Sequence, residues 1–143
     1  MFRAIKESDK DIFIELATEF YNSEAVLHPI PKENMINAFN ALMQTTPYMD
    51  GYIFEYDDRI VGYALVCKSY SMEAGGLTYL IDEIYIREEF RNKKLGREFF
   101  DYILNSENIK RFRLEVEHSN KRAIKLYKNV GFNLLTYMQM YKE

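Results

Sequence analysis

The 143-residue chain contains a single cysteine, no excess of basic residues and no long hydrophobic run. One cysteine, Cys67, excludes an intramolecular disulfide framework and is typical of a reducing compartment. A net charge of −3 and a pI of about 5.5 argue against the basic surface of a nucleic-acid-binding domain. Eighteen uninterrupted apolar residues occur nowhere, and the N-terminus lacks the apolar segment of a signal peptide. We therefore expect a cytoplasmic protein that binds neither nucleic acid nor a membrane.

The apolar content is high enough for one domain spanning residues 1–143, because 48% of the residues are apolar and 15% are aromatic. Hydrophobic periodicity predicts helices that begin near residues 9, 31, 95 and 120. It predicts strands at residues 2–5, 52–56, 60–70, 78–86, 112–117 and 134–141, the last of which could be two short strands. The order β-α-α-β-β-β-α-β-α-β(-β) predicts an α/β fold with a mixed, mostly antiparallel central sheet and about four helices on both faces.

The most informative stretch is residues 78–104, which reads as an apolar strand, a short basic loop and an amphipathic helix. The loop is Arg91-Asn92-Lys93-Lys94-Leu95-Gly96. Unpaired N–H groups at a helix start, the positive end of the helix dipole and nearby cations all favour a bound anion. Positive side chains at this end oppose the dipole, so they make more sense with an anion present. The stretch therefore predicts a site for a phosphorylated ligand.

Two motifs in the chain resemble those of one enzyme family. Arg91-x-x-Lys94-x-Gly96, which follows the strand that ends at Ile86, resembles the acyl-CoA loop Arg/Gln-x-x-Gly-x-Gly/Ala. The pattern Asn-x-x-Ala-x-x-x-Tyr-x-x-x-Gly-Phe is matched by Asn120, Ala123, Tyr127, Gly131 and Phe132. Together, at this separation and in this element order, they resemble the GNAT N-acetyltransferase superfamily over essentially the whole chain.

The resemblance implies that the chain binds acetyl-CoA without a metal. The residues it assigns to the cofactor are Ile84, Tyr85, Ile86, Arg91, Asn92, Lys93, Lys94, Leu95, Gly96, Arg97, Asn120 and Tyr127. The chain departs from the family pattern at Lys94, where the loop has its first glycine. Glycine takes a positive φ more readily than lysine, whereas Lys94 could supply a charge to the phosphates. His28 and His118 lack partners at ligand spacing, so no metal site is expected.

The chemistry requires a proton acceptor for the amine and a proton donor for the thiolate. An amine with a pKa near ~10 is mostly protonated at neutral pH, and a carboxylate can take its proton through water. Asp82 and Glu83 are the candidates. Strand alternation predicts that they point to opposite faces unless a bulge intervenes, with Asp82 on the face of Ile84 and Ile86. The resemblance makes the Tyr127 phenol the proton donor, and backbone N–H groups near residues 84 and 86 the donors to the oxyanion.

Each candidate residue also has a purely structural interpretation. Asp82 or Glu83 could form an ion pair with Arg113 or Arg91, Tyr127 could be a core aromatic residue, and Asn120 could only cap a helix. The resulting hypothesis is an N-acetyltransferase that moves an acetyl group directly from acetyl-CoA to a primary amine of a small molecule, peptide or protein. The alternative is a non-catalytic acyl-CoA-binding sensor or interaction module. Residues 22–46, which would shape the acceptor site, contain no motif that identifies the amine, and the resemblance allows a homodimer.

Overall fold

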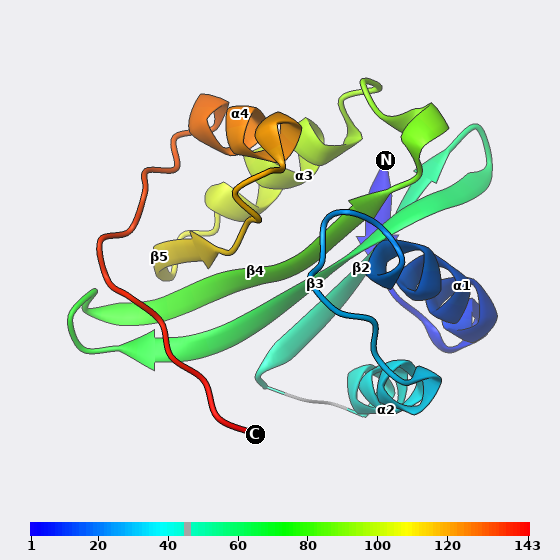
Figure 1. Cartoon of the computed structure of the whole chain (residues 1–143), viewed down its shortest axis with the longest axis horizontal. Helices are drawn as coiled ribbons and strands as arrows, with labels where there is room; N and C mark the ends of the chain where they lie inside the picture. The colour runs from blue at the N-terminus through cyan, green and yellow to red at the C-terminus, as the bar shows by residue number, and fades with distance from the viewer. Residues whose placement is uncertain (45–46) are drawn as a thin grey trace.

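The computed structural model describes residues 1–44 and 47–143 and is built around one mixed sheet (Figure 1). The strand order is β1-β2-β3-β4-β5. The first four strands pair antiparallel, and β5 joins β4 in parallel. The strands are β1 Phe2–Ala4, β2 Met49–Tyr56, β3 Arg59–Ser71, β4 Gly76–Ile86 and β5 Ile109–Leu114. The helices are α1 Lys10–Tyr21, α2 Lys32–Met43, α3 Leu95–Leu104 and α4 Lys121–Asn129. The predicted α/β fold is confirmed.

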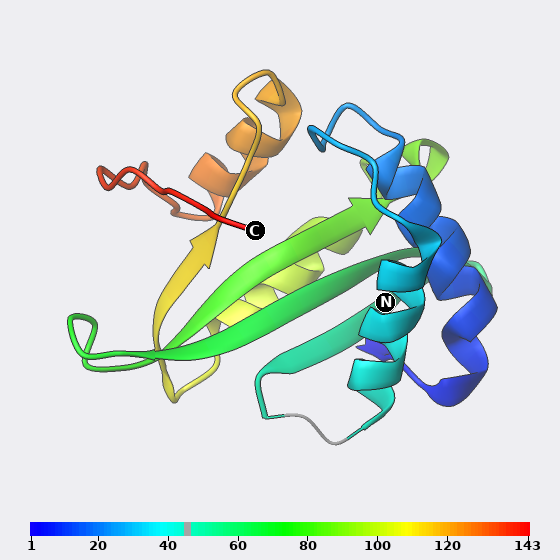
Figure 2. The ribbon, with the colours of Figure 1, turned by 60° about the horizontal axis from the view of Figure 1, so that its bottom comes forward.

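The helices cover the two faces of the sheet in pairs, with α1 and α2 on one face and α3 and α4 on the other (Figures 1 and 2). The face towards α1 and α2 contributes Ile53, Tyr63 and Leu65 to a core that includes Phe13 and Leu16. The opposite core, under α3, is built from Phe54, Val61, Ala64, Val66, Ile81, Phe90, Leu95, Phe99, Phe100 and Ile103. Successive side chains of β2 and β3 point to opposite faces, so these central strands contribute to both cores, whereas each helix buries one stripe.

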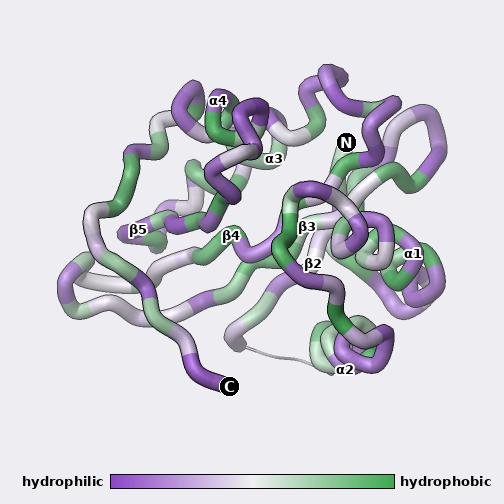
Figure 3. Tube along the Cα trace, viewed as in Figure 1, coloured by the Kyte–Doolittle hydropathy of each residue, from purple (hydrophilic) through white to green (hydrophobic). Residues whose placement is uncertain are grey.

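Hydropathy along the chain separates the core elements from the connection that carries the predicted loop. Figure 3 shows the connection from β4 to α3 as largely hydrophilic, next to apolar stretches of both elements. A short 3-10 turn, Glu88–Phe90, begins this connection, and its Phe90 is buried. Phe90 therefore anchors the connection to the core while Asn92, Lys93 and Lys94 remain exposed. Within the described ranges, no helix is both long and apolar enough to cross a membrane.

Two predictions of regular structure were wrong. The strand expected at residues 112–117 lies earlier, at β5 Ile109–Leu114, because the chain leaves β4 after Leu114. Residues 134–141, which were predicted to form one or two short strands, form no strand, and the side chains of Met138 and Met140 are 92% and 95% exposed. The segment instead runs across the β3–β4 hairpin (Figure 1), where the Tyr137 hydroxyl lies 3.5 Å from Glu73 Oε1. A strand pattern needs a paired edge, and this segment pairs with none among the described residues.

Candidate active site

A β-bulge in β4 positions the two candidate carboxylates. Leu65 of β3 pairs with Glu83, but the next residue, Val66, pairs with Ile81, so Asp82 is left over on β4. An extra residue of this kind breaks the alternation of side chains and bends the strand locally. The bulge allowed as an exception in the sequence analysis is therefore present, and it lies at Asp82 itself.

Because of this bulge, Asp82 does not share a face with Ile84 and Ile86, and that prediction was wrong. Ile84 and Ile86 pack against the core under α3. The Asp82 carboxylate instead lies 3.9 Å from the sulfur of Cys67, which follows Leu65 at strand spacing on the face towards α1. Burial and then Glu83 raise the pKa of Tyr21 and Tyr63 on that face, and the negative charge of Asp82 adds a smaller increase. Both carboxylates thus face the α1 side.

Glu83 is fixed by two tyrosines from different elements. The hydroxyl of Tyr63, on β3, donates to Oε2 at 2.7 Å, and the hydroxyl of Tyr21, at the end of α1, donates to Oε1. Burial raises the pKa of the Glu83 carboxyl, the two tyrosine hydrogen bonds lower it in part, and the charge of Asp82 raises it further. The net direction is upward. Neither tyrosine was among the predicted site residues. In the sequence, Tyr21 belongs to the apolar stripe of a helix and Tyr63 to an apolar strand.

Asp82 has a different environment from its neighbour. Its side chain is exposed, and its one hydrogen-bond contact in the described chain is the weak one with the Cys67 thiol. The surrounding protein still removes part of its hydration, and this desolvation, together with repulsion from Glu115, raises its pKa. The same neighbourhood raises the pKa of the Cys67 thiol to about 11, mainly through burial. The expected ion pairs with Arg91 or Arg113 are not formed by either carboxylate within the described ranges.

The sheet opens beside these carboxylates. The parallel pairing of β4 with β5 ends at Ile81 and Leu114, whereas β4 continues to Ile86. From Glu83 to Ile86, β4 is therefore paired on its β3 side alone among the described strands. Figure 2 shows β5 diverging from β4 towards α4. The splay leaves an edge of β4 whose backbone groups are available to an extended ligand.

The basic loop ends in a helix start without a capping side chain. Lys94 is the N-cap residue of α3, with φ 66° and ψ 5°, and its side chain makes no capping hydrogen bond. The first bond of the helix runs from the N–H of Glu98 to the carbonyl of Lys94 at 2.9 Å. The N–H groups of Leu95, Gly96 and Arg97 precede that first bond and so lack an intrahelical partner. Lys94 thus adopts the left-handed conformation that glycine takes more readily.

The positive side chains of the loop and of the start of α3 have different partners. Arg91 donates from Nε to the carbonyl of Ile86 at 2.8 Å and lies over the Tyr85 ring. The Lys93 ammonium lies 5.8 Å from the Tyr56 ring centre. Arg97 pairs with Asp101 one turn further along α3, with Nε and Oδ1 3.0 Å apart.

The loop is tied to α4 by a residue that the sequence analysis did not assign to the site. Arg122 donates to Oδ1 of Asn92 at 2.8 Å. Its place within the second motif, one residue before Ala123, was the available signal. Gly96 also faces α4, since a Cβ there would lie 3.7 Å from a Leu126 methyl group. These contacts bring the two motifs together in space.

Asn120 and Tyr127 lie at opposite ends of α4. Asn120 is the N-cap residue, and its side-chain oxygen accepts from the N–H of Ala123 at 3.2 Å, so it caps the helix. The ring of Tyr127 packs against Phe100 and Phe132 at centroid distances of 5.6 and 6.3 Å. Burial raises the pKa of its half-buried phenol to about 12. In the described chain Tyr127 makes no hydrogen bond to either carboxylate, so the structure brings it to the α3 core rather than into direct contact with them.

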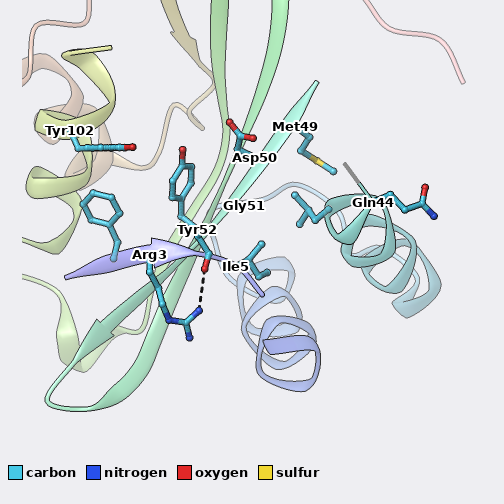
Figure 4. A pocket seen from close by; sticks show the side chains of 11 residues that line it. Arg3, Ile5, Gln44, Met49, Asp50, Gly51, Tyr52 and Tyr102 are labelled. Atoms are coloured by element: carbon cyan, nitrogen blue, oxygen red, sulfur yellow. Dashed lines mark hydrogen bonds between the residues drawn. The ribbon is translucent and has the colours of Figure 1, made fainter. Parts of the chain in front are cut away.

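The surface has one hollow near the two carboxylates and another away from them. One of about 280 Å³ is lined by Tyr21 and the segment that follows α1. Another, of about 740 Å³, lies where β1, β2 and the end of α2 meet (Figure 4). Its lining includes Arg3, Asp50 and Tyr52 but none of the predicted site residues. The larger hollow is thus separate from the carboxylates, and the smaller one borders them through Tyr21.

The splayed mixed sheet, with a basic loop and an uncapped helix at the splay, is an acetyltransferase fold. The chain belongs to the acetyltransferase (GNAT) family, whose model matches residues 10–132. The resemblance inferred from the two motifs is therefore confirmed.

Individual relatives agree with this assignment. The thialysine N-epsilon-acetyltransferase of Bos taurus is 35% identical over 80 residues, which are 54% of this chain and 46% of that protein. The chain thus matches about half the length of such relatives. A possible acetyltransferase from Clostridium difficile 630 has the same fold, with a TM-score of 0.82 at 20% identity over 100% of this chain and 96% of the other. An aminoglycoside N-acetyltransferase in complex with CoA also has it, with a TM-score of 0.75 at 14% identity over 100% of this chain and 93% of the other.

Proposed function

We propose that residues 1–143 act as one acetyltransferase domain that moves an acetyl group from acetyl-CoA to a primary amine of a small molecule, peptide or protein. One observation carries the proposal. The uncapped start of α3, behind a left-handed Lys94, lies at the end of the β4 edge that the splay leaves unpaired. The bulged carboxylates Asp82 and Glu83 begin that same edge. An anion-binding helix start and a proton-accepting group are thus joined by one strand.

The geometry fits the parts of CoA in order. The free N–H groups at the start of α3 and the exposed Lys94 suit the pyrophosphate. The β4 edge at residues 84–86 that faces away from β3 suits the amide groups of pantetheine and the developing oxyanion, and the amide nitrogen of Asn120 lies beside its capping oxygen. Acetyl-CoA supplies the acetyl group as an activated thioester. A solved relative of the same fold holds CoA, which supports the assignment.

Asp82 is the stronger candidate for the proton acceptor. It is exposed, has a raised pKa and has no strong hydrogen-bond donor in the described chain, whereas both oxygens of Glu83 already accept from tyrosines. A raised carboxyl pKa makes proton transfer from an ammonium less unfavourable. Asp82 takes the proton that the amine loses as its nitrogen bonds to the acetyl carbon. Tyr127 donates the proton that the sulfur gains as the carbon–sulfur bond breaks. The similar proteins described above are N-acetyltransferases of thialysine and of aminoglycosides, and this supports an amine acceptor.

The proposal is tested by combining a melting curve with a thiol-release assay. Saturating acetyl-CoA should raise the melting temperature, because a ligand at about 100 times its Kd stabilises the folded state by about 2.7 kcal/mol. Release of free CoA thiol should then depend on an added primary amine. Absence of a melting shift at millimolar acetyl-CoA would refute cofactor binding. A shift without thiol release for any amine would identify the non-catalytic acyl-CoA-binding module instead.

A further inference from the structure

Glu83 is an anion that is held in place but not neutralised. Its two oxygens accept hydrogen bonds from Tyr21 and Tyr63, which are neutral donors. Among the described residues no lysine, arginine or histidine forms an ion pair with Glu83, Asp82 or Glu115. A half-buried carboxylate that is fixed and lacks a counter-ion favours the binding of a cation.

A cation on this face, Arg87, is already engaged. Arg87 forms an ion pair with Glu19, with Nη2 and Oε1 2.8 Å apart, and a second one with Glu15. Glu19 also accepts from the Tyr85 hydroxyl at 3.0 Å. These contacts hold the Arg87 charge at α1, so it is not available to Glu83.

Aromatic rings border the same carboxylate. Tyr63 packs against Tyr85 with ring centres 6.4 Å apart, and Phe20 contacts Tyr21, Tyr63 and Tyr85 at 5.1 to 6.2 Å. Tyr63 and Phe20 are buried, and Arg91 lies over the Tyr85 ring. The partly exposed ring of Tyr21 can attract an organic ammonium group in addition to the attraction of the carboxylate. The ring of Tyr21 also lines the 280 Å³ hollow beneath the segment that joins α1 to α2. Figures 1 and 2 both place that segment over the carboxyl-terminal half of β4.

The two carboxylates therefore have different surroundings although they are adjacent. Asp82 is exposed, and its hydrogen-bond contact among the described residues is with a thiol, which suits a group that must accept and release a proton. Glu83 is clamped from two elements, one of which supplies the partly exposed ring of Tyr21, and this suits a fixed charge that recognises a substrate. The bulge is what places them on one face, within reach of a single small acceptor.

On the basis of the proposed acetyl transfer, we infer that Glu83, clamped by Tyr21 and Tyr63, is a specificity-determining residue that binds a second positive charge of the acceptor. The preferred acceptors are then compounds with two amino groups, one of which reacts beside Asp82 while the other remains an ammonium ion at Glu83. Tyr21 is a positioning residue, because it holds Glu83 from the end of α1 and borders the segment that covers the site. A hydrogen-bonded ammonium–carboxylate pair contributes enough for about a tenfold preference or more.

The test compares linear diamines, from ethylenediamine to hexamethylenediamine, with the monoamines of equal carbon number in the thiol-release assay. The wild-type protein should show a higher kcat/KM for diamines, with an optimum at one chain length. Glu83→Gln keeps the size of the side chain and should reduce the diamine-to-monoamine ratio of kcat/KM at least tenfold, through KM. Asp82→Asn should lower kcat for both amine classes and leave the ratio unchanged. Glu107→Gln removes one exposed charge outside the site and serves as the matched control.

The outcomes separate this inference from the proposed function. If no amine releases thiol, the proposed acetyl transfer itself fails. If thiol is released but Glu83→Gln leaves the ratio unchanged, or lowers kcat equally for both classes, the specificity role of Glu83 is refuted. Tyr63→Phe and Tyr21→Phe keep the packing of the rings and should each lower the ratio in the same direction as Glu83→Gln, by a smaller factor. A lowered ratio in these variants with an unchanged melting temperature would exclude a merely structural effect of the clamp.

Discussion

The conformation of Lys94 provides a quantitative test of the loop. With φ 66°, it occupies the left-handed region, which costs a residue with a Cβ about 1–2 kcal/mol. Glycine avoids this cost but loses about 0.4–1 kcal/mol through the greater freedom of the unfolded chain. Glycine at position 94 should therefore be more stable than alanine by about 0.5–1 kcal/mol, the difference between these terms. In a chain of this size that corresponds to a rise in melting temperature of roughly 2–4 °C.

Lys93 offers a matched control one residue away. It is exposed like Lys94 but is not among the residues with positive φ. Alanine at position 93 should thus be more stable than glycine, by about 0.4–1 kcal/mol. Because alanine and glycine both remove the lysine charge, each comparison isolates the backbone term.

The assay is thermal unfolding of the four variants, followed by circular dichroism without ligand. The account predicts that the order of glycine and alanine reverses between positions 93 and 94. If alanine is the more stable residue at both positions, Lys94 does not adopt the left-handed conformation. The helix start proposed for the pyrophosphate would then need a different geometry.

Three further predictions concern the reaction, the N-terminal strand and the sheet. Tyr127→Phe should lower thiol release about 100-fold or more, as expected for loss of a general acid, while the melting shift caused by acetyl-CoA persists; equal activity would remove Tyr127 from the mechanism. Burial alone would raise the pKa of Asp9, but hydrogen bonds from Arg3 and a backbone N–H outweigh it and lower the pKa below 3.8. Asp9→Asn should therefore cost about 1–3 kcal/mol in urea unfolding at neutral pH, and its deficit should vanish as the pH falls through that lowered pKa; a constant deficit would contradict this. Gly62→Ala places a Cβ 2.3 Å from a backbone oxygen of β4 and should cost roughly 3 kcal/mol, whereas Gly96→Ala meets only ordinary contacts and should cost much less.

The fold was predictable because local patterns and global packing agree in most of the chain. The stripes on α1 and α3 specify which side of each helix is buried, and the continuous apolar run of β3 is typical of a central strand that is buried on both faces. The segment at residues 134–141 is also rich in apolar and aromatic residues, yet it forms no strand. Such a composition is typical of strands, but it does not supply the partner edge that a strand requires.

The candidate site was predictable in its residues more than in its geometry. The motifs identified Asp82, Glu83 and Tyr127, but strand alternation assigned Asp82 to the wrong face because a bulge leaves no distinct signature in the sequence. The clamp on Glu83 joins Tyr21 and Tyr63 across 62 and 20 residues of sequence, and long-range contacts of this kind follow from the tertiary fold. Lys94 was recognised as the departure from the loop pattern, and the structure shows that the chain keeps the left-handed conformation there without glycine.

The central claim is that this chain transfers the acetyl group of acetyl-CoA to an amine. The most direct measurement incubates the purified protein with acetyl-CoA and a panel of primary amines, and quantifies both free thiol and the mass of the amine product. The account predicts one acetyl group added to an amine for each thiol released, with the protein itself left unmodified. Thiol release without an acetylated amine, or no release with any amine while acetyl-CoA still raises the melting temperature, would contradict it.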